Sequence, residues 1–426
     1  MPCLKLYFIN HSNIYIMKKV VLSAAALMCG AIMVAQTNTS DVLSDGDGNG
    51  SVVTQTGNLN DSDVDQIGDG NDSNVSQSGT SNTSDVDQLT YTLGTSNDNT
   101  SAVTQVGTEN DSFVWNDGDD HNSTVDQDGT SNYSYVNMWG NNSTSAVTQD
   151  GSDNDSYVWQ WNQTNDHNSS VLQEGDNNYS DVRQEDGDGN DSEVIQGGNL
   201  NNSDVDQLGN LNSSIVRQYG NSNESDVLQD GDSNISTVEQ GYNWYLGNSM
   251  VSTVDQIGDN NTSYVGQWGT GSISDVDQIG NSNDALLYQW GDNNNSDVYQ
   301  DGDDNSSNVI QGYNSDNHIS TVDQLGNNHI SYVSQKGDSN LSDVDQNGGD
   351  ENDSSVSQDG TTNDSDVDQI GNLNGSIVSQ TGLSHMSTVY QFGDSNMSDV
   401  SQMGTTHTSM VNQLGNMNTS TVSQSN

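Results

Sequence analysis

The sequence is very poor in three kinds of residue. Its 426 residues include 2 cysteines, 1 proline and only 6 lysines and arginines together. Cys3, Cys29 and Pro2 all precede residue 36, so the remainder can form no disulfide and can keep every backbone donor of a β-sheet. With 61 acidic residues and a net charge of −55, the chain has no basic face for nucleic acid.

Hydrophobic residues are also scarce, at 29%. Such polarity combined with a high net charge is typical of disordered chains. However, residues 203–224 read SDVDQLGNLNSSIVRQYGNSNE, which is two copies of S-x-V-x-Q-x-G-x-x-N-x. From Ser40 to Asn426 the sequence divides into 34 consecutive units of this kind. Disordered chains do not place residues at fixed intervals, so we predict one repeat array over residues 40–426.

The N-terminal segment has the features of a secretory signal. Met17, Lys18 and Lys19 precede the apolar run VVLSAAALMCGAIMVA, which is too short for a membrane span. We predict a signal peptide over residues 17–35, an upstream over-read of the start site over residues 1–16, and a short segment over residues 36–39. Lipidation of Cys29 is a weaker alternative, because Met28 is a poor residue in front of it. The mature chain is thus expected to be secreted and not inserted in a membrane.

The repeat also predicts a strand and a turn. Within N-x-S-x-V-x-Q-x-G every second residue is one that recurs from unit to unit. Because side chains alternate along a strand, Asn, Ser, Val, Gln and Gly share one face of it. The two residues between Gly and the next Asn make a turn, for which Gly and Asn are well suited. This turn restores the alternation that an odd repeat of 11 residues would otherwise break. Ser, Val and Gln should therefore point inward in every unit.

Aspartate shows that the structural period is two units. Asp directly follows Ser at Asp41, Asp63, Asp85, Asp181, Asp204, Asp226, Asp275, Asp297, Asp343, Asp366 and Asp399. When units are counted from zero at Ser40, all of these except Asp399 fall in even-numbered units. We predict an all-β, amyloid-like β-solenoid of about 17 strand-turn-strand coils with a period of about 22 residues. Two parallel sheets would lie face to face, with equivalent residues stacked about 4.7–4.8 Å apart along a rod roughly 80 Å long.

Stacked amides can bond to each other along such a rod and so satisfy buried polar groups. We therefore expect the core to consist of ladders of equivalent residues. The predicted ladder residues are Ser62, Val64, Gln66, Gly68 and Asn71; Ser203, Val205, Gln207, Gly209 and Asn212; Ser214, Val216, Gln218, Gly220 and Asn223; and the pairs Gln256 and Asn261, Gln278 and Asn283, and Gln369 and Asn374.

These tandem Ser-x-Val-x-Gln-x-Gly-x-x-Asn units behind a secretory signal resemble the repeats of curlins, the subunits of curli-type bacterial amyloid fibres. The resemblance implies a secreted subunit that crosses the outer membrane through a channel and joins other copies end to end into biofilm fibres. It also implies a nucleator subunit that starts fibre assembly. It also implies Gln and Asn stacking at the positions given above. The chain departs from familiar curlins in its length and in having only residues 36–39 before the repeats, where those proteins carry a secretion-targeting segment.

The sequence contains no unique catalytic constellation, so we predict no enzymatic activity and no cofactor. Paired outward aspartates could form acidic rows that bind Ca²⁺, namely Asp63 with Asp65, Asp204 with Asp206, and Asp366 with Asp368. A diffuse counter-ion cloud with a solubilising role is the favoured alternative. His121, His329, His385 and His407 occupy Asn positions, where replacement of Asn in the ladder is favoured over a metal site.

Two further sets of residues interrupt the pattern. The irregular segments 89–100, 161–168, 241–251 and 312–319 are expected to be loops that extend from turns. The outward aromatic residues include Trp159, Trp161, Trp268, Tyr288, Trp290 and Tyr299. They could bind glycans or neighbouring fibrils, although packing against aromatic residues of adjacent strands is favoured. The alternative function is therefore a secreted solenoid that binds a surface, a glycan or ice without polymerising. Outward threonines are too scattered to favour ice.

Overall fold

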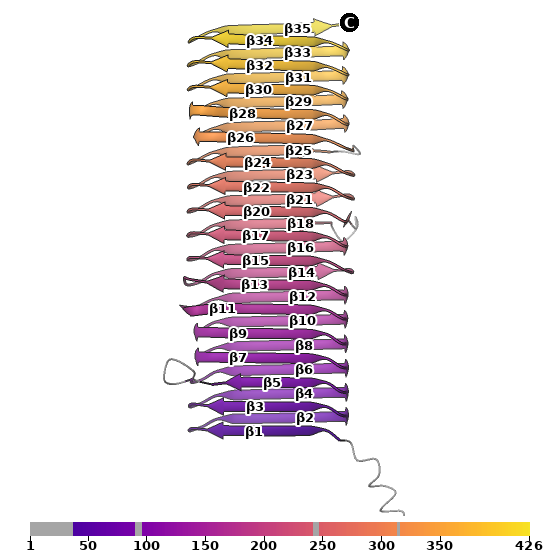
Figure 1. Cartoon of the computed structure of the whole chain (residues 1–426), viewed down its shortest axis with the longest axis vertical. Helices are drawn as coiled ribbons and strands as arrows, with labels where there is room; N and C mark the ends of the chain where they lie inside the picture. Colours follow the sequence, from indigo (N-terminus) through magenta and orange to yellow (C-terminus); the bar gives the residue numbers. More distant parts are fainter. Residues whose placement is uncertain (1–36, 90–95, 242–246, 313–315) are drawn as a thin grey trace, which may run out of the picture.

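The computed structural model describes residues 37–89, 96–241, 247–312 and 316–426. These residues contain strands and turns, which stack into a straight rod with the chain rising coil by coil from β1 to β35 (Figure 1). No helix long and apolar enough to cross a bilayer occurs in them. The predicted signal peptide and the start-site segment lie outside the described residues.

One sheet has 17 parallel strands, one from each coil. Its strands, in order along the rod, are β1 (Thr39–Asp45), β3 (Asp61–Ile67), β5 (Thr83–Gln88), β7 (Asp111–Asp119), β9 (Tyr133–Asn141), β11 (Asp155–Asn165), β13 (Tyr179–Glu185), β15 (Asn202–Leu208), β17 (Glu224–Asp230), β20 (Val251–Ile257), β22 (Ile273–Ile279), β24 (Asn295–Asp301), β26 (Ile319–Asn327), β28 (Leu341–Asp350), β30 (Asp364–Ile370), β32 (Met386–Phe392) and β34 (Thr408–Leu414). We call this the first sheet.

The second sheet contains the alternate strands of the chain and is also parallel. Its strands are β2 (Gly50–Asn58), β4 (Asp72–Thr80), β6 (Thr100–Thr108), β8 (Asn122–Thr130), β10 (Thr144–Ser152), β12 (Asn168–Asp176), β14 (Asp191–Gly197), β16 (Ser213–Asn221), β18 (Ile235–Gln240), the two-residue β19 (Gly247–Asn248), β21 (Thr262–Trp268), β23 (Asp284–Trp290), β25 (Ser306–Gln311), β27 (Ile330–Asp338), β29 (Asp353–Thr361), β31 (Gly375–Leu383), β33 (Met397–Thr405) and β35 (Thr419–Ser425).

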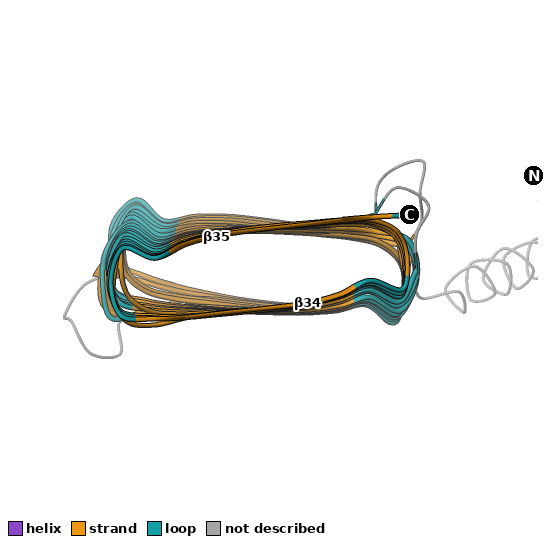
Figure 2. Ribbon diagram, turned by 90° about the horizontal axis from the view of Figure 1, so that it is seen from above, coloured by secondary structure: helices purple, strands orange, loops and turns teal. Residues whose placement is uncertain are grey.

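The register confirms the period of two units. Ser62 pairs with Ser84, Val64 with Val86 and Gln66 with Gln88, a shift of 22 residues. Seen from the end of the rod, the two sheets form the long sides of a narrow cross-section, which turns close at both ends (Figure 2). The predicted β-solenoid with two parallel sheets face to face is therefore confirmed.

The core consists of the inward positions, as the alternation predicts. Val64, Val205 and Val216 are fully buried, as are Gln207 and Gln218, whereas the residues between them face outward. The apolar core is one cluster that runs through the rod, made of the inward valines of both sheets together with Met138, Ala285 and Leu287. Because each side chain is buried by the coils above and below it, a hydrophobic content of 29% suffices to close the interior.

The turns depend on Gly and on one left-handed residue two positions after it. In a representative turn Gly209 has φ of 102° and Leu211 has φ of 57°, immediately before Asn212. A Cβ atom added to Gly209 would lie 2.2 Å from the carbonyl oxygen of Gly231 in the next coil. Glycine is required here because neighbouring coils approach each other through their backbones.

The structure corrects the expectation for one irregular segment, and parts of the other three lie outside the described residues. Segment 161–168 is not simply a loop, because β11 continues to Asn165 and absorbs the extra residues in a register shift between Gln160 and Thr164. Residues 90–95, 242–246 and 313–315 lie outside the described residues. In segment 241–251, Gly247 and Asn248 form β19, which pairs with the end of β16.

Candidate assembly surfaces

Glutamine forms a ladder in each sheet that also joins the two sheets. The ladder of the second sheet is continuous from Gln55 to Gln424, whereas Asn116 and Met138 interrupt the ladder of the first sheet. The Nε2 atom of Gln66 donates to Oε1 of Gln88 at 2.9 Å and lies 2.9 Å from the carbonyl oxygen of Gly50 in the opposite sheet. The same two bonds recur at Gln218, which donates to Gln240. Gln66 and Gln218 each therefore bind the next coil and the facing sheet at once, and glutamine stacks on glutamine at these positions.

Asparagine forms a second ladder, but it binds mainly to backbone. The Oδ1 atom of Asn212 accepts the backbone N–H of Asn234 at 2.9 Å, and its Nδ2 atom donates to the carbonyl oxygen of Gly231 at 2.8 Å. Asn261 and Asn283 repeat this arrangement. Direct bonds between stacked asparagine amides, which the sequence allows, occur elsewhere, as from Nδ2 of Asn178 to Oδ1 of Asn154 at 3.1 Å, but not at these positions. Their amides instead hold the turn of the next coil.

Histidine replaces asparagine in this ladder, as predicted for His121, His329, His385 and His407. The Nδ1 atom of His329 accepts the backbone N–H of Asn352 at 3.2 Å, as Asn Oδ1 does elsewhere. His167 and His318 occupy the same position in other coils. Burial lowers the pKa of His121 to about 4, so this imidazole is neutral and accepts a hydrogen bond at neutral pH.

Serine contributes differently from the amides. The hydroxyl groups of Ser62, Ser203 and Ser214 are buried and have no hydrogen-bond partner among the described residues. Gln207 crosses the core to the carbonyl oxygen of Asp191, the residue directly before the buried Ser192. Serine thus leaves room for the glutamine of the opposite sheet, and its hydroxyl adds little to the polar network.

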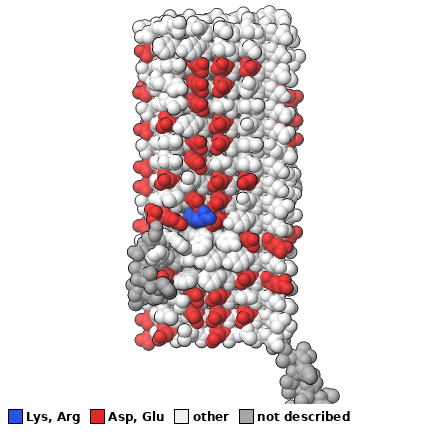
Figure 3. All heavy atoms as spheres, in the orientation of Figure 1, with Lys and Arg blue, Asp and Glu red and all other residues white. Residues whose placement is uncertain are grey.

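The outer surface of the first sheet carries two acidic rows, formed by the residues directly after Ser and directly before Gln. Figure 3 shows them as two columns of acidic side chains along the rod, interrupted by a band of other residues. The carboxylates in these rows belong to Asp41, Asp63, Asp65, Asp85, Asp87, Asp181, Asp204, Asp206, Asp226, Asp255, Asp275, Asp277, Asp297, Asp323, Asp343, Asp345, Asp366 and Asp368.

Partial burial and mutual repulsion raise the pKa values in the acidic rows. Desolvation raises the pKa of Asp87 to about 7, with repulsion from Asp85, Asp65 and Asp63 as further causes. The same causes, desolvation first, raise the pKa of Asp204 to about 6, against the lowering effect of Arg183. The rows therefore oppose coil stacking most strongly when fully ionised.

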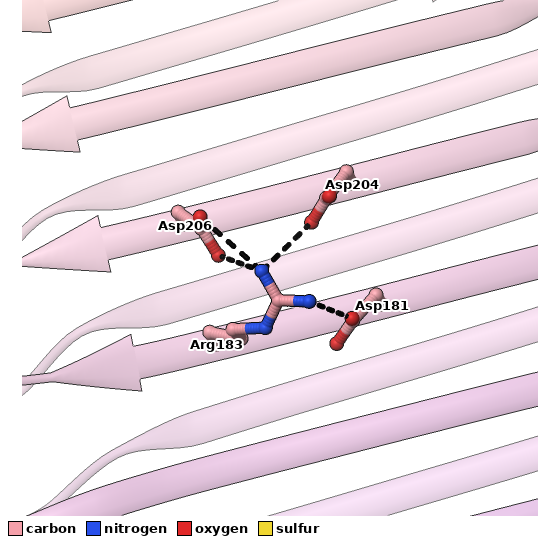
Figure 4. Close-up of polar contacts among 4 residues, drawn as sticks. All are labelled: Asp181, Arg183, Asp204 and Asp206. Carbon is pink, nitrogen blue, oxygen red and sulfur yellow. Dashed lines mark hydrogen bonds and ion pairs between the residues drawn. The ribbon is translucent and has the colours of Figure 1, made fainter.

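One arginine bridges the rows in the middle of the rod. Arg183 contacts Asp181 on its own strand and lies 3.3 Å from Asp206 and 4.0 Å from Asp204 on the next strand (Figure 4). The predicted pair Asp204 and Asp206 is thus brought together around a guanidinium. In the second sheet, Arg217 bridges Glu193 and Glu239 from the coils on either side of it.

The structure places the other predicted acidic pairs in stacked rows. Asp63 and Asp65 face Asp85 and Asp87 in register. Asp366 and Asp368 likewise face Asp343 and Asp345. Within the described ranges, no group of three or more His, Cys, Asp or Glu residues is arranged to hold a metal ion. Calcium binding by these rows remains a prediction.

Aromatic side chains interrupt the acidic rows and pack along the rod. In the first sheet, the ring centroids of Phe113 and Tyr135 lie 5.1 Å apart with nearly parallel planes, and those of Tyr135 and Trp159 lie 4.5 Å apart. In the second sheet, Trp268 stacks on Trp290 at 5.0 Å. This is the cross-strand packing that the sequence favours for outward aromatic residues.

Both ends of the described rod expose strand edges. Among the described residues, β1 and β2 at the first end each pair with a strand on one side only. The same holds for β34 and β35 at the other end. Val42 of β1 is 44% exposed, whereas the equivalent valines inside the rod are buried. Free edges of parallel strands can accept further strands.

The described residues form a parallel β-solenoid with amide ladders inside and edge strands that have a neighbouring strand on one side only. In its C-terminal part, the family model described as the Curlin associated repeat matches residues 280–312, 316–348, 333–360 and 393–425. The same coil geometry and register continue through the remaining units down to β1. No curated protein matches the chain.

Proposed function

We propose that the chain is a secreted structural subunit that assembles end to end into curli-like amyloid fibres, which contribute to a biofilm matrix and to surface adhesion. The observation that carries this proposal is that all neighbouring coils use one interface, and that the edge strands at both ends offer the two halves of it. Curlin repeats belong to a structural, extracellular family, which supports the same function.

Under this proposal the chain needs neither catalysis nor a cofactor. The export route through the outer membrane and a separate nucleator subunit are part of the proposal, and they rest on the family and the predicted signal peptide. The acidic rows would keep the exported chain soluble until its edges meet another copy.

A second candidate is a secreted binding module that does not polymerise. The stacked pair Trp268 and Trp290, next to Tyr288, favours it, because flat aromatic clusters on a rigid surface can bind a glycan. Electron microscopy of the purified chain, kept concentrated at neutral pH with salt, separates the two candidates. Unbranched fibres that bind amyloid dyes support the fibre subunit, whereas persistent monomers over several days contradict it.

A further inference from the structure

The outer surface of the first sheet and its inner glutamine ladder change in the same coils. On the outside, a band of other residues interrupts the acidic rows (Figure 3). On the inside, Asn116 of β7 and Met138 of β9 stand where other coils have glutamine. The thioether of Met138 has no proton to donate, and Oε1 of Gln160 in β11 is buried with no hydrogen-bond partner among the described residues. The joint between β9 and β11 therefore lacks the amide bond of the ladder.

Tyrosine rings pack across this joint on the outside. The ring centroid of Tyr157 in β11 lies 5.5 Å from that of Tyr133 and 6.4 Å from that of Tyr135, both in β9. On the other side it lies 5.7 Å from that of Tyr179 in β13. The planes within these three pairs are inclined by 44°, 36° and 43°. Tyr157 is thus the centre of a tyrosine column that crosses three successive coils.

We propose that Tyr157 is an oxidative cross-linking site, at which a one-electron oxidant joins its ring to that of Tyr133 or Tyr179 as dityrosine. The cross-link would fasten β11 to the coil before it or after it. The sequence has no cysteine beyond Cys29, so the rod has no disulfide for this purpose. This inference goes beyond the proposed function and does not depend on it, because all of the rings belong to one molecule.

The coupling reaction balances with hydrogen peroxide as the oxidant and a haem peroxidase as the one-electron carrier. Each of two phenols loses one electron and one proton and becomes a phenoxyl radical. The radicals form a bond between the ring carbons next to their hydroxyl groups, and a proton shift from each of these carbons to its oxygen restores both aromatic rings. Hydrogen peroxide takes up the two electrons and two protons and becomes two water molecules.

The arrangement of the rings allows this bond to form. The reactive carbons lie on the ring edges. Inclined rings whose centroids are 5.5 or 5.7 Å apart can bring two edges together by rotation about their side-chain dihedral angles. Tyr179 is 38% exposed, and Tyr133 and Tyr157 are half-buried, so an oxidant in solution can reach the column.

Carboxylates beside the phenols can take up the protons. Desolvation raises the pKa of Tyr157, and the charges of Asp155 and Asp181 raise it further. Desolvation and then Asp181 likewise raise the pKa of Tyr179. Asp181 is 4% exposed; one of its oxygens contacts Arg183, and Oδ1 has no hydrogen-bond partner in the part of the chain that the structure describes (Figure 4). This oxygen is therefore available to accept a proton that leaves either phenol.

The first test locates the cross-links by mass spectrometry. The purified full chain is diluted until its molecules stay separate, treated with a haem peroxidase and hydrogen peroxide, and digested at aspartate residues. We expect peptides that join Tyr157 to Tyr133 and Tyr157 to Tyr179, each lighter by two hydrogen atoms than its two parts. A parent chain that yields neither product, or yields them only between different molecules, would overturn the proposal.

Substitution by phenylalanine keeps the ring and removes the hydroxyl group. Tyr157→Phe should lose both products, and Tyr179→Phe should lose only its own. The matched control is Tyr390→Phe, because Tyr390 is an outward tyrosine of the same sheet whose neighbours in register are Asp368 and Asn412. This control should keep both products. Equal cross-linking in Tyr157→Phe and Tyr390→Phe would overturn the assigned site.

The second test measures whether the cross-links fasten the joint. Before oxidation, Tyr157→Phe and Tyr390→Phe should unfold at nearly the parental denaturant concentration. Oxidation should raise the midpoint of Tyr390→Phe as much as that of the parent, because a cross-link restricts the unfolded chain. The gain should be smaller in Tyr157→Phe, where the contact of Tyr264 with Tyr288 at 5.2 Å in the second sheet remains for coupling. Equal gains in the two oxidised variants would overturn the proposed role of Tyr157 at the joint.

Discussion

Gln207 donates a hydrogen bond from Nε2 to Oε1 of Gln229 at 2.9 Å, and the same nitrogen lies 3.0 Å from the carbonyl oxygen of Asp191 in the opposite sheet. One side chain therefore connects two successive coils and the two sheets. Buried amides with both kinds of bond satisfied do not carry the penalty of an unpaired polar group. This is how a chain with so few hydrophobic residues keeps a closed interior.

Two adjacent residues of β8 test the division between inside and outside. Val125 is fully buried, whereas Thr124 is exposed and faces Ala102 and Ala146 in register. We expect Val125→Asp to lower the free energy of unfolding by about 3 kcal/mol or more, because it buries an unpaired charge. Thr124→Asp should change it by about 0.5 kcal/mol or less. Denaturant unfolding of both variants measures this, and similar losses would mean that the faces are assigned wrongly.

The sequence predicts the solenoid because Ser, Val and Gln recur at fixed spacing and because aspartate marks alternate units. It does not predict the partners of Asn212, whose amide binds the backbone of Gly231 and Asn234, since that depends on how closely the turns approach. Nor does composition reveal that the hydroxyl group of Ser203 is buried with no hydrogen-bond partner in the part of the chain that the structure describes. The extension of β11 to Asn165 also escaped prediction, because its extra residues contain no turn signal strong enough to distinguish a bulge from a loop.

The raised pKa of Asp87 predicts a pH-dependent effect. This carboxyl has a pKa of about 7 in the folded chain, mainly because of desolvation, and about 3.9 when unfolded. Between these values the folded state binds a proton that the unfolded state lacks, so stability decreases as pH rises through this range. Asp87→Asn should therefore raise the denaturant midpoint at pH 8 and change it little near pH 4. An equal effect at both pH values would contradict the assigned cause.

The left-handed residue in each turn offers a stabilising substitution. Leu211 has φ of 57° and a side chain that is 64% exposed, so it pays the steric cost of that conformation without packing in return. Leu211→Asn should raise the free energy of unfolding by about 0.5–1 kcal/mol, since asparagine tolerates positive φ. Leu383→Asn, at an exposed leucine that is not in this conformation, is the control and should give no such gain. The account of the turn fails if the two variants are equally stable.

Screening of the acidic rows predicts how assembly depends on salt. Carboxylates on the rod surface interact over about a Debye length, roughly 10 Å at 0.1 M salt. The lag time before fibre growth should therefore shorten with added NaCl and with a fall in pH toward 4. CaCl₂ at matched ionic strength distinguishes bridging from screening: a shorter lag than in NaCl indicates specific calcium contacts, for example at Asp63 and Asp65, and identical curves exclude them. A lag time unaffected by salt, calcium or pH would contradict the electrostatic account.

The central claim is that copies of the chain continue one solenoid along a common axis. Electron cryomicroscopy of fibres grown from the purified chain tests it most directly, because the direction of the strand spacing is visible in the images. We predict an uninterrupted repeat of about 4.7–4.8 Å along the fibre axis, with the strands perpendicular to that axis and no gap between copies. A solution that contains only single rods, or fibres in which the solenoid axis lies across the fibre, would contradict the claim.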